Sequence, residues 1–574
     1  MGRTCAGRST GGQSILPDVT PTESFERARA VLLRHREDLE AARAEFRWPV
    51  LTEFNWARDW FDVLAARNRK TALRIVSEAT GVHEASYQEL SERSTRLARY
   101  LHDHGVARGD RVLVMLTNVM PLWETMLAAM RLGAVVIPAT VQLTPDDVDD
   151  RIARGEVKHM VTDGEGAEKL RRPERLRVRL AVGGAEKFTP YDDALAAPAQ
   201  VEPVPTRASD PLLLYFTSGT TAKPKLVLHT HESYPVGHLS TMYWLGLRED
   251  DVHENVSSPG WAKHAWSSFF APWNAGATVL VHDYARFSAK RTLEVLHEHE
   301  VSTLCAPPTV WRMLILESLG QRPPRLRELA SAGEPLNPEV IATVQTAWGI
   351  TIRDGYGQTE TTAQVGNPPG LPVRPGSMGK PLPGYSIALL DHEGHEAKEG
   401  EVAIRLAPRP TPLMVGYLDD PERTSAVTAG GYYRTGDEAS HDDDGYIHFV
   451  GRGDDVFKSS DYRISPFELE SVLVEHELVA EAAVVPSPDP VRLSVPKAFV
   501  VLRPGTPETR ETARAIFELC SARLAPYKRV RRLEFAALPK TISGKIRRVE
   551  LRKLEEGRRA RSERGPAEFW LEEM

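Results

Sequence analysis

Cysteine is scarce in this sequence: Cys5, Cys305 and Cys520 are the only three among 574 residues. So few thiols provide neither a disulfide framework nor a zinc cluster, and they indicate a reducing compartment. Positive charge is not in excess either, because the net charge is −7. A mildly acidic chain is not typical of nucleic-acid-binding proteins, which usually carry a basic face. We therefore expect no nucleic-acid partner.

Long hydrophobic runs are also missing. The most apolar stretch, 112–143, is interrupted by Asn118, Pro121, Glu124 and Arg131, so it does not predict a membrane span. The N-terminus carries arginines and serines but has no apolar core of a secretory signal. The sequence therefore predicts a soluble cytoplasmic protein without a membrane partner, either a monomer or a homodimer.

The chain is too long for one ordinary hydrophobic core, so at least two domains are expected. From residue 72 onward, short β-rich apolar runs alternate with helical patterns, which favours an α/β fold with largely parallel sheets flanked by helices. Strands are expected at 111–116, 135–138, 159–162 and 212–217, and helices at 90–102 and 122–132. Beyond a segment rich in proline and glycine, antiparallel strands of a small barrel-like subdomain are expected at 385–390 and 400–404.

A polar, glycine-containing break at 451–455 divides the sequence into two domains of unequal size. A leader and one charged helix over 22–48 are expected within residues 1–50, followed by the large domain over 51–450. Residues 456–574 predict a small α+β domain. Its expected elements are a helix at 466–476, strands at 482–485 and 497–501, a helix at 511–524 and a charged tail.

The strongest local motif is the segment 215–225, Tyr-Phe-Thr-Ser-Gly-Thr-Thr-Ala-Lys-Pro-Lys. An apolar strand leads into a loop whose backbone N–H groups, hydroxyls and ammonium groups suit phosphate oxygens. It is not the common nucleotide P-loop, because G-x-x-x-x-G-K-[ST] is absent from the whole sequence. A serine- and threonine-rich solvent turn is the alternative for this loop taken alone.

Three further motifs follow in order. The segment 354–360, Asp-Gly-Tyr-Gly-Gln-Thr-Glu, has two glycines that allow close backbone approach, a tyrosine face for a base, and Glu360 for Mg²⁺. The segment 433–437, Tyr-Arg-Thr-Gly-Asp, places the Asp437 carboxylate after a turn, where it suits two ribose hydroxyls. The segment 539–547, Pro-Lys-Thr-Ile-Ser-Gly-Lys-Ile-Arg, places Lys545 after a Ser-Gly turn.

The order and wording of these motifs resemble the adenylate-forming superfamily of acyl-CoA synthetases, luciferases and adenylation domains, from about residue 52 to 550. Within it, the segments 53–60 and 457–470 are most similar to medium-chain and aromatic acyl-CoA synthetases. The resemblance implies a ligase that uses ATP, Mg²⁺ and coenzyme A. It would join a carboxylic acid and ATP to acyl-AMP and pyrophosphate, and then pass the acyl group to coenzyme A with release of AMP.

The resemblance also implies roles for single residues. Lys545 would bridge the substrate carboxylate and the α-phosphate, Glu360 would bind Mg²⁺, and Thr359 would join them in catalysis. Asp454 would be the hinge about which the C-terminal domain rotates. ATP would contact Thr217, Ser218, Gly219, Thr220, Thr221, Lys225, Gly333, Glu334, Pro335, Asp354, Gly355, Tyr356, Gly357, Gln358, Asp437 and Arg452.

A second set of residues is implied for coenzyme A, because a cationic cluster suits its phosphorylated adenosine. The implied contacts are Gln142, Ser460, Asp461, Tyr462, Arg463, Arg492, Lys528, Arg529 and Arg531. Asp461 departs from the family, which often has glycine at this position. This aspartate keeps open an adenylating enzyme with another acceptor, such as a carrier protein or an amine. A nucleotide sensor without catalysis is disfavoured, because the implied catalytic residues are present.

The acyl pocket can be predicted in outline. Acetate-specific relatives have tryptophan where this chain has Gly357, so more than two carbons should fit. Trp261 is expected in the pocket wall, and Trp266 and Phe270 are either wall or core. The acid is therefore expected to be medium-chain, branched or aromatic. His229 and His231 are expected to form local hydrogen bonds and not a metal site.

Overall fold

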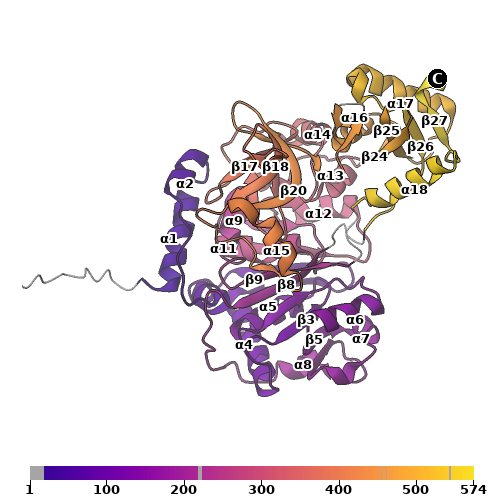
Figure 1. Ribbon diagram of the computed structural model, residues 1–574. Coiled ribbons are helices and arrows are strands. Elements are labelled where there is room, and N and C mark those ends of the chain that lie inside the picture. The colour runs from indigo at the N-terminus through magenta and orange to yellow at the C-terminus, as the bar shows by residue number, and fades with distance from the viewer. Residues whose placement is uncertain (1–18, 218–222, 454, 460–461, 491, 542–544) are drawn as a thin grey trace, which may run out of the picture.

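The computed structural model describes residues 19–217, 223–453, 455–459, 462–490, 492–541 and 545–574. Figure 1 shows a large body built around two sheets, a smaller C-terminal unit beside it, and the first two helices lying along one flank. The predicted division into a large α/β domain and a small C-terminal α+β domain is confirmed.

The first sheet has eight strands in the order β19-β9-β8-β4-β3-β5-β6-β7. Strands β3 to β8 run parallel, and β8 and β9 form an antiparallel hairpin. Alternate residues of β3 face opposite helical layers: Val112 packs in the core with α4 and α5, and Leu113 in the core with α6. The strands are β3 Arg111–Met115, β4 Val135–Pro138, β5 His159–Asp163, β6 Val178–Val182, β7 Thr189–Pro190, β8 Pro211–Thr217, β9 Lys225–Thr230 and β19 Gly416–Tyr417.

The second sheet has thirteen strands in the order β17-β18-β20-β21-β16-β15-β14-β13-β12-β10-β11-β1-β2. Its parallel part runs from β1 to β14, and the antiparallel strands expected as a separate small subdomain extend the same sheet. The strands are β1 Thr71–Ser77, β2 Gly81–Ser86, β10 Val252–Asn255, β11 Thr278–Asp283, β12 Thr303–Ala306, β13 Glu328–Ala332, β14 Ile352–Gly357, β15 Ala363–Gly366, β16 Ser377–Pro381, β17 Ile387–Leu390, β18 Glu399–Arg405, β20 Tyr432–His441 and β21 Ile447–Arg452.

Side chains that cap the first turn begin several helices. Thr20, Ser86 and Thr144 each accept a backbone N–H three residues later, and an acidic residue there bonds back to the cap. Before the C-terminal unit the helices are α1 Pro21–Arg34, α2 Leu39–Glu45, α3 Val63–Arg67, α4 Tyr87–Asp103, α5 Met120–Arg131, α6 Pro145–Arg154, α7 Gly164–Glu168, α8 Tyr191–Ala194, α9 His238–Leu245, α10 Ala262–Ala265, α11 Ala271–Ala275, α12 Ala289–Glu298, α13 Pro308–Leu314, α14 Pro338–Trp348 and α15 Pro421–Val427.

The C-terminal unit packs two helices against a four-stranded sheet, in the order β24-β25-β26-β27. Among the residues that the structure describes, no helix is long and apolar enough to cross a membrane. The elements are β22 Phe457–Ser459, β23 Tyr462–Ile464, α16 Pro466–Val474, β24 Val479–Asp489, β25 Leu493–Leu502, α17 Arg510–Arg523, β26 Arg532–Phe535, α18 Arg548–Ala560 and β27 Glu568–Trp570.

Two sequence-based expectations at the ends of the chain are wrong. The single helix expected over 22–48 is two helices, because α1 ends before His35 and the Asp38 side chain caps α2 by accepting the Ala41 N–H at 3.0 Å. The expected charged tail is instead helix α18 and strand β27, which pairs with β26. Charge misled the second prediction, because Glu555 and Glu568 of this segment are buried against cations.

Candidate functional site

The predicted phosphate-binding loop joins the two strands of the β8–β9 hairpin, with Thr217 paired to Lys225 at its base. The Thr217 hydroxyl is buried and has no hydrogen-bond partner among the described residues. The other four loop residues predicted to contact ATP lie outside the described residues: Ser218, Gly219, Thr220 and Thr221. The hairpin therefore fixes the two ends of the loop next to each other, with the Thr217 hydroxyl at one end and the Lys225 side chain at the other.

A hydrogen-bonded group surrounds Asp437 on β20. The Tyr356 hydroxyl donates to its Oδ2 at 2.6 Å, and the Gln358 amide donates to the same oxygen at 2.7 Å. Tyr433 fixes the amide in turn, because its hydroxyl donates to Gln358 Oε1 at 2.9 Å. Arg452, at the end of β21, pairs with Asp437 in the sheet register. Burial raises the pKa of Asp437, and the bond from Tyr356 opposes this rise.

The predicted adenine wall follows β13 and β14. The Asp354 carboxylate is 7% exposed and accepts the Gly355 N–H at 2.9 Å, and burial raises its pKa to about 7. Gly333 adopts a positive φ of 109°, which turns the chain after β13 toward Glu334 and Pro335. β13 and β14 pair in parallel, with Ser331 beside Asp354. Asp354 therefore lies close to the end of β13, where the loop 333–335 begins.

Glu360 lies in the turn between β14 and β15 and is 8% exposed. Its Oε1 accepts the Tyr417 hydroxyl at 2.9 Å, and the Lys225 ammonium lies 3.9 Å from the same oxygen. Thr359 is held through its backbone carbonyl, which lies 2.7 Å from the Nε2 atom of His229. The turn therefore brings together the predicted Mg²⁺ ligand and the predicted phosphate-binding lysine.

Lys545 comes from the C-terminal unit. Its side chain is exposed, and its backbone N–H donates to the Thr541 hydroxyl at 3.1 Å. Burial lowers the pKa of Lys263, on α10, and the Lys545 charge adds to this effect. The same charge opposes the rise that burial causes in the pKa of Asp437. The Lys545 charge therefore acts on two groups of the large domain, Lys263 and Asp437.

Sequence reasoning missed two residues of this site, Lys263 and Tyr417. The Lys263 ammonium donates to the Ala332 carbonyl at 3.2 Å, directly before the adenine wall. The only available signal for Lys263 was its position between the tryptophans at 261 and 266. Tyr417 follows a glycine in a segment that contains no other motif, so nothing distinguished it from a core tyrosine.

The two glycines of the 354–360 motif are required for different reasons. A Cβ on Gly357 would lie 2.1 Å from the Thr362 backbone carbonyl, so the close backbone approach expected there is seen within the protein, and it would also lie 2.6 Å from the Trp266 ring. A Cβ on Gly355 would lie 2.3 Å from the Trp244 ring, so this glycine makes room for a tryptophan of the protein itself. Trp266 and Phe270 are core residues, whereas Trp261 is only partly buried and remains a candidate for the acyl pocket.

The predicted coenzyme A contacts are described only in part. Ser460 and Asp461 lie outside the described residues, as does the hinge residue Asp454. Tyr462 and Arg463 form part of the backbone of β23. Of the other predicted contacts, Gln142 is exposed. Two of the cations lie near glutamates: Lys528 pairs with Glu468 at 2.7 Å, and Arg531 lies 3.5 Å from Glu572. The other two arginines bond within the C-terminal unit, since the Arg492 backbone N–H donates to Asp489 and the Arg529 guanidinium donates to the Ser521 carbonyl.

The two histidines at 229 and 231 differ in their contacts. The His229 Nδ1 atom lies 2.9 Å from the Ser233 hydroxyl, so His229 is bonded on both ring nitrogens as expected. His231 is also buried, but its ring nitrogens have no hydrogen-bond partner among the described residues, so the local bond expected for it is not seen. No group of three or more potential metal ligands occurs in the described part of the chain.

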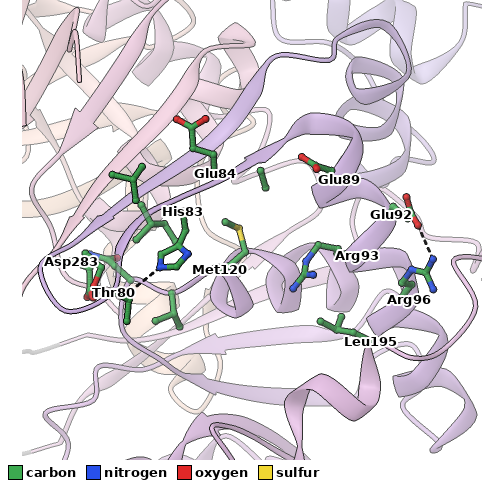
Figure 2. A pocket seen from close by; sticks show the side chains of 16 residues that line it. Thr80, His83, Glu84, Glu89, Glu92, Arg93, Arg96, Met120, Leu195 and Asp283 are labelled. Atoms are coloured by element: carbon green, nitrogen blue, oxygen red, sulfur yellow. Dashed lines mark hydrogen bonds and ion pairs between the residues drawn. The ribbon is translucent and has the colours of Figure 1, made fainter. Parts of the chain in front are cut away.

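Figure 2 shows a separate cavity of about 790 Å³, lined by β1, β2, α4 and the loop after β3. Of the predicted site residues that the structure describes, none lines it. Several of its polar side chains are bonded to each other or to the core: Thr80 with His83 at 2.8 Å, Glu92 with Arg96 at 2.7 Å, and Arg93 with the buried Glu124. The cavity is therefore not the place where the sequence motifs meet.

Comparisons with known proteins match most of the chain. The profile of the family described as AMP-binding enzyme matches residues 61–418, and that of the AMP-binding enzyme C-terminal domain matches residues 468–545. The 4-hydroxybutyrate–CoA ligase 1 of Metallosphaera sedula is 46% identical over 533 residues, which cover 90% of this chain and 94% of that protein. The mitochondrial acyl-coenzyme A synthetase ACSM3 of Rattus norvegicus is 37% identical over 92% of this chain and 95% of its own length.

A solved structure agrees with these sequence matches. The crystal structure of the anthranilate CoA ligase AuaEII in complex with anthranoyl-AMP superposes with a TM-score of 0.80. That structure is 27% identical in sequence, and the match covers 89% of this chain and 99% of the other.

Proposed function

The chain belongs to the family of AMP-binding enzymes and is an ATP-dependent, AMP-forming acid–CoA ligase; we propose which of its residues carry each half-reaction. ATP, Mg²⁺ and coenzyme A are the co-substrates and metal of this reaction. The acid and ATP first form acyl-AMP and pyrophosphate, and coenzyme A then takes the acyl group and releases AMP. The observation that supports these roles best is that the 354–360 motif touches Asp437 through Tyr356 and Gln358, and brings Glu360 to 3.9 Å from Lys225.

Asp437 and Arg452 would hold the ribose of ATP. A carboxylate can accept hydrogen bonds from two adjacent hydroxyls, and the bonds from Tyr356 and Gln358 fix its orientation before the nucleotide arrives. Asp354 and the loop from Gly333 to Pro335 would form the adenine wall. The phosphates would extend toward Lys225 and the loop at the end of the β8–β9 hairpin, where donors suit anionic oxygens.

Glu360 fits a magnesium site that the nucleotide completes. Mg²⁺ is commonly bound by one or two carboxylates together with substrate phosphates, and Glu360 supplies one nearly buried carboxylate here. When bound, the metal neutralises charge on the phosphoryl oxygens. The Tyr417 hydroxyl and the Lys225 ammonium near Glu360 Oε1 orient the carboxylate on one side.

Lys545 would stabilise the adenylation transition state. An acid carboxylate that attacks the α-phosphate brings two anions together, and a fixed ammonium at that point reduces their repulsion. Lys540 and Arg548 of the same basic segment are occupied by ion pairs with Glu481 and Glu470. The Lys545 charge acts on Lys263 and Asp437 of the large domain.

The second half-reaction needs no nucleophile from the enzyme, because the thiol arrives with coenzyme A. We expect the C-terminal unit to rotate about the segment 451–455, so that the residues predicted for coenzyme A replace Lys545 at the acyl-adenylate. The names of the relatives support an acid with more than two carbons, since they include a 4-hydroxybutyrate–CoA ligase and an anthranilate CoA ligase. A cytoplasmic location and a monomer or homodimer stay predictions.

A panel of acids tests this function. Pyrophosphate release from ATP would be measured for each acid with and without coenzyme A, and acyl-CoA would be quantified in the same samples. We expect acid-dependent pyrophosphate release and a thioester that appears only with coenzyme A. Pyrophosphate release without any thioester would instead favour a different acceptor, and no release from any acid would refute adenylation.

A further inference from the structure

Tyr417 contacts both of the residues proposed to handle the phosphates and their metal. Its hydroxyl donates to Glu360 Oε1 at 2.9 Å, and its ring centroid lies 5.1 Å from the Lys225 ammonium. The guanidinium carbon of Arg423 lies 5.7 Å from the ring centroid, so two cations lie near the same ring. The tyrosine itself is only 5% exposed.

The chain around Tyr417 fixes its position. Its backbone N–H donates to the Thr424 hydroxyl at 2.8 Å, and β19 pairs it with Val227 of β9. Three residues earlier, the Met414 N–H donates to the backbone carbonyl of Glu360 at 2.8 Å. One short segment therefore holds Glu360 by its main chain and by its carboxylate, and anchors both contacts on the strand that begins with Lys225.

This arrangement keeps two opposite charges from neutralising each other. The Lys225 ammonium lies 3.9 Å from Glu360 Oε1, outside hydrogen-bond distance, while the tyrosine hydroxyl occupies that oxygen. The electron-rich ring face attracts the ammonium at the same time. Without the hydroxyl, the ammonium can close onto the carboxylate as a direct ion pair. In such a pair Lys225 is withdrawn from phosphate, and Glu360 from metal.

We propose that Tyr417 is a positioning residue, which keeps Glu360 open to the nucleotide-bound magnesium and Lys225 open to phosphate. This inference rests on the proposed roles of those two residues. It adds a requirement that neither role contains: the enhancement of ATP binding by Mg²⁺ should depend on the Tyr417 hydroxyl.

Calorimetry of ATP binding tests the proposal without catalysis. The dissociation constant for ATP is measured in Mg²⁺ and in EDTA, and the ratio of the two gives the enhancement by the metal. Tyr417→Phe keeps the ring and removes the hydroxyl, so the enhancement should fall by about tenfold, as expected for one hydrogen bond to a charged group. In a Glu360→Gln background, the same change should alter the enhancement by less than about twofold, because the partner is already gone.

Tyr432→Phe is the matched control. The Tyr432 hydroxyl also donates to a glutamate, Glu396 Oε1 at 2.8 Å, but this exposed bond joins the start of β20 to the connection between β17 and β18. In Tyr432→Phe, the enhancement of ATP binding by Mg²⁺ should equal that of the wild type. If Tyr417→Phe does not fold, Thr424→Val is the second variant, since it removes the hydroxyl that accepts the Tyr417 N–H. It should lower the enhancement in the same direction.

The outcomes separate this inference from the proposed function. An unchanged enhancement in Tyr417→Phe, or equal weakening of ATP binding with and without Mg²⁺, would overturn the positioning role while leaving the ligase assignment intact. Additive effects of the Tyr417 and Glu360 substitutions would overturn it as well. A wild-type protein that binds no ATP, or that binds it without any metal effect, would instead contradict the proposed nucleotide site.

Discussion

Replacement of Lys545 by methionine separates the two half-reactions. The side chain is exposed, and the Lys545 backbone is bonded to Thr541: the Thr541 N–H donates to the Lys545 carbonyl at 2.7 Å, and the Lys545 N–H donates to the Thr541 hydroxyl at 3.1 Å. The substitution leaves these bonds in place. We therefore expect a change in stability of no more than about 0.5 kcal/mol, as for other surface substitutions.

The loss of rate should be much larger than the loss of stability. One preorganised donor aimed at developing charge is worth about 10²–10³ in rate, or about 2.7–4 kcal/mol. Acid-dependent exchange of labelled pyrophosphate into ATP should fall by that factor in Lys545→Met. Thioester formation from a synthetic acyl-adenylate and coenzyme A should remain at the wild-type rate, because the proposed rotation moves Lys545 away before the thiol reacts.

Lys540→Met is the control for this experiment. Lys540 lies five residues away in the same basic segment, but its ammonium pairs with Glu481 at 2.7 Å. A surface ion pair of this kind contributes about 0–1 kcal/mol to stability, and we expect no effect on either half-reaction. Equal losses in both half-reactions of Lys545→Met, or an equal loss of exchange in Lys540→Met, would refute the role given to Lys545.

Two further predictions concern buried charge. Burial raises the pKa of Asp354 from 3.8 to about 7, so its contribution to stability is full below pH 4 and is lost as the pH rises to about 7. Asp354→Asn should therefore gain stability over the wild type between pH 5 and 8, toward a limit of about 4 kcal/mol, and a gap independent of pH in urea unfolding would contradict this. Lys497→Met should destabilise the C-terminal unit by about 3–5 kcal/mol, because three buried glutamates within 2.9 Å would lose their shared cation. Hydrogen exchange should then accelerate in that unit and not in the large domain, and uniform acceleration would argue against a local cluster.

The regular elements of the fold could be predicted from periodicity. The strand expected at 135–138 matches β4 at both ends, and the helix expected at 122–132 matches α5 to within two residues. Such segments combine an apolar pattern with clear ends, so local sequence determines them. The C-terminal tail could not be predicted in this way, because its charges are satisfied by partners distant in sequence. The cation of Lys497 is about seventy residues away from its partner Glu568.

The candidate site also contains residues that local sequence indicates and residues that only the fold brings into place. Asp437 and Lys545 could be proposed from the sequence, because each lies in a motif whose residue types already indicate a chemistry. Tyr417 could not, since its importance comes from the fold, which brings it to Glu360 from 57 positions away. The close backbone approach expected at the 354–360 motif is seen at Gly357, against the Thr362 carbonyl, whereas the need for glycine at 355 comes from the packing of Trp244, which the sequence does not show.

Strand β27 has a consequence for the genetics of this protein. It pairs with β26, and its Glu568 binds Lys497 in the C-terminal unit. The ring centroid of its Trp570 lies 3.9 Å from the guanidinium carbon of Arg564. A nonsense or frameshift allele that removes only residues 561–574 would leave every motif intact, yet it would unpair this edge of the sheet. We expect such an allele to lower adenylation through loss of the scaffold that carries Lys545, so a screen for the overall reaction would group it with changes in Lys545 itself.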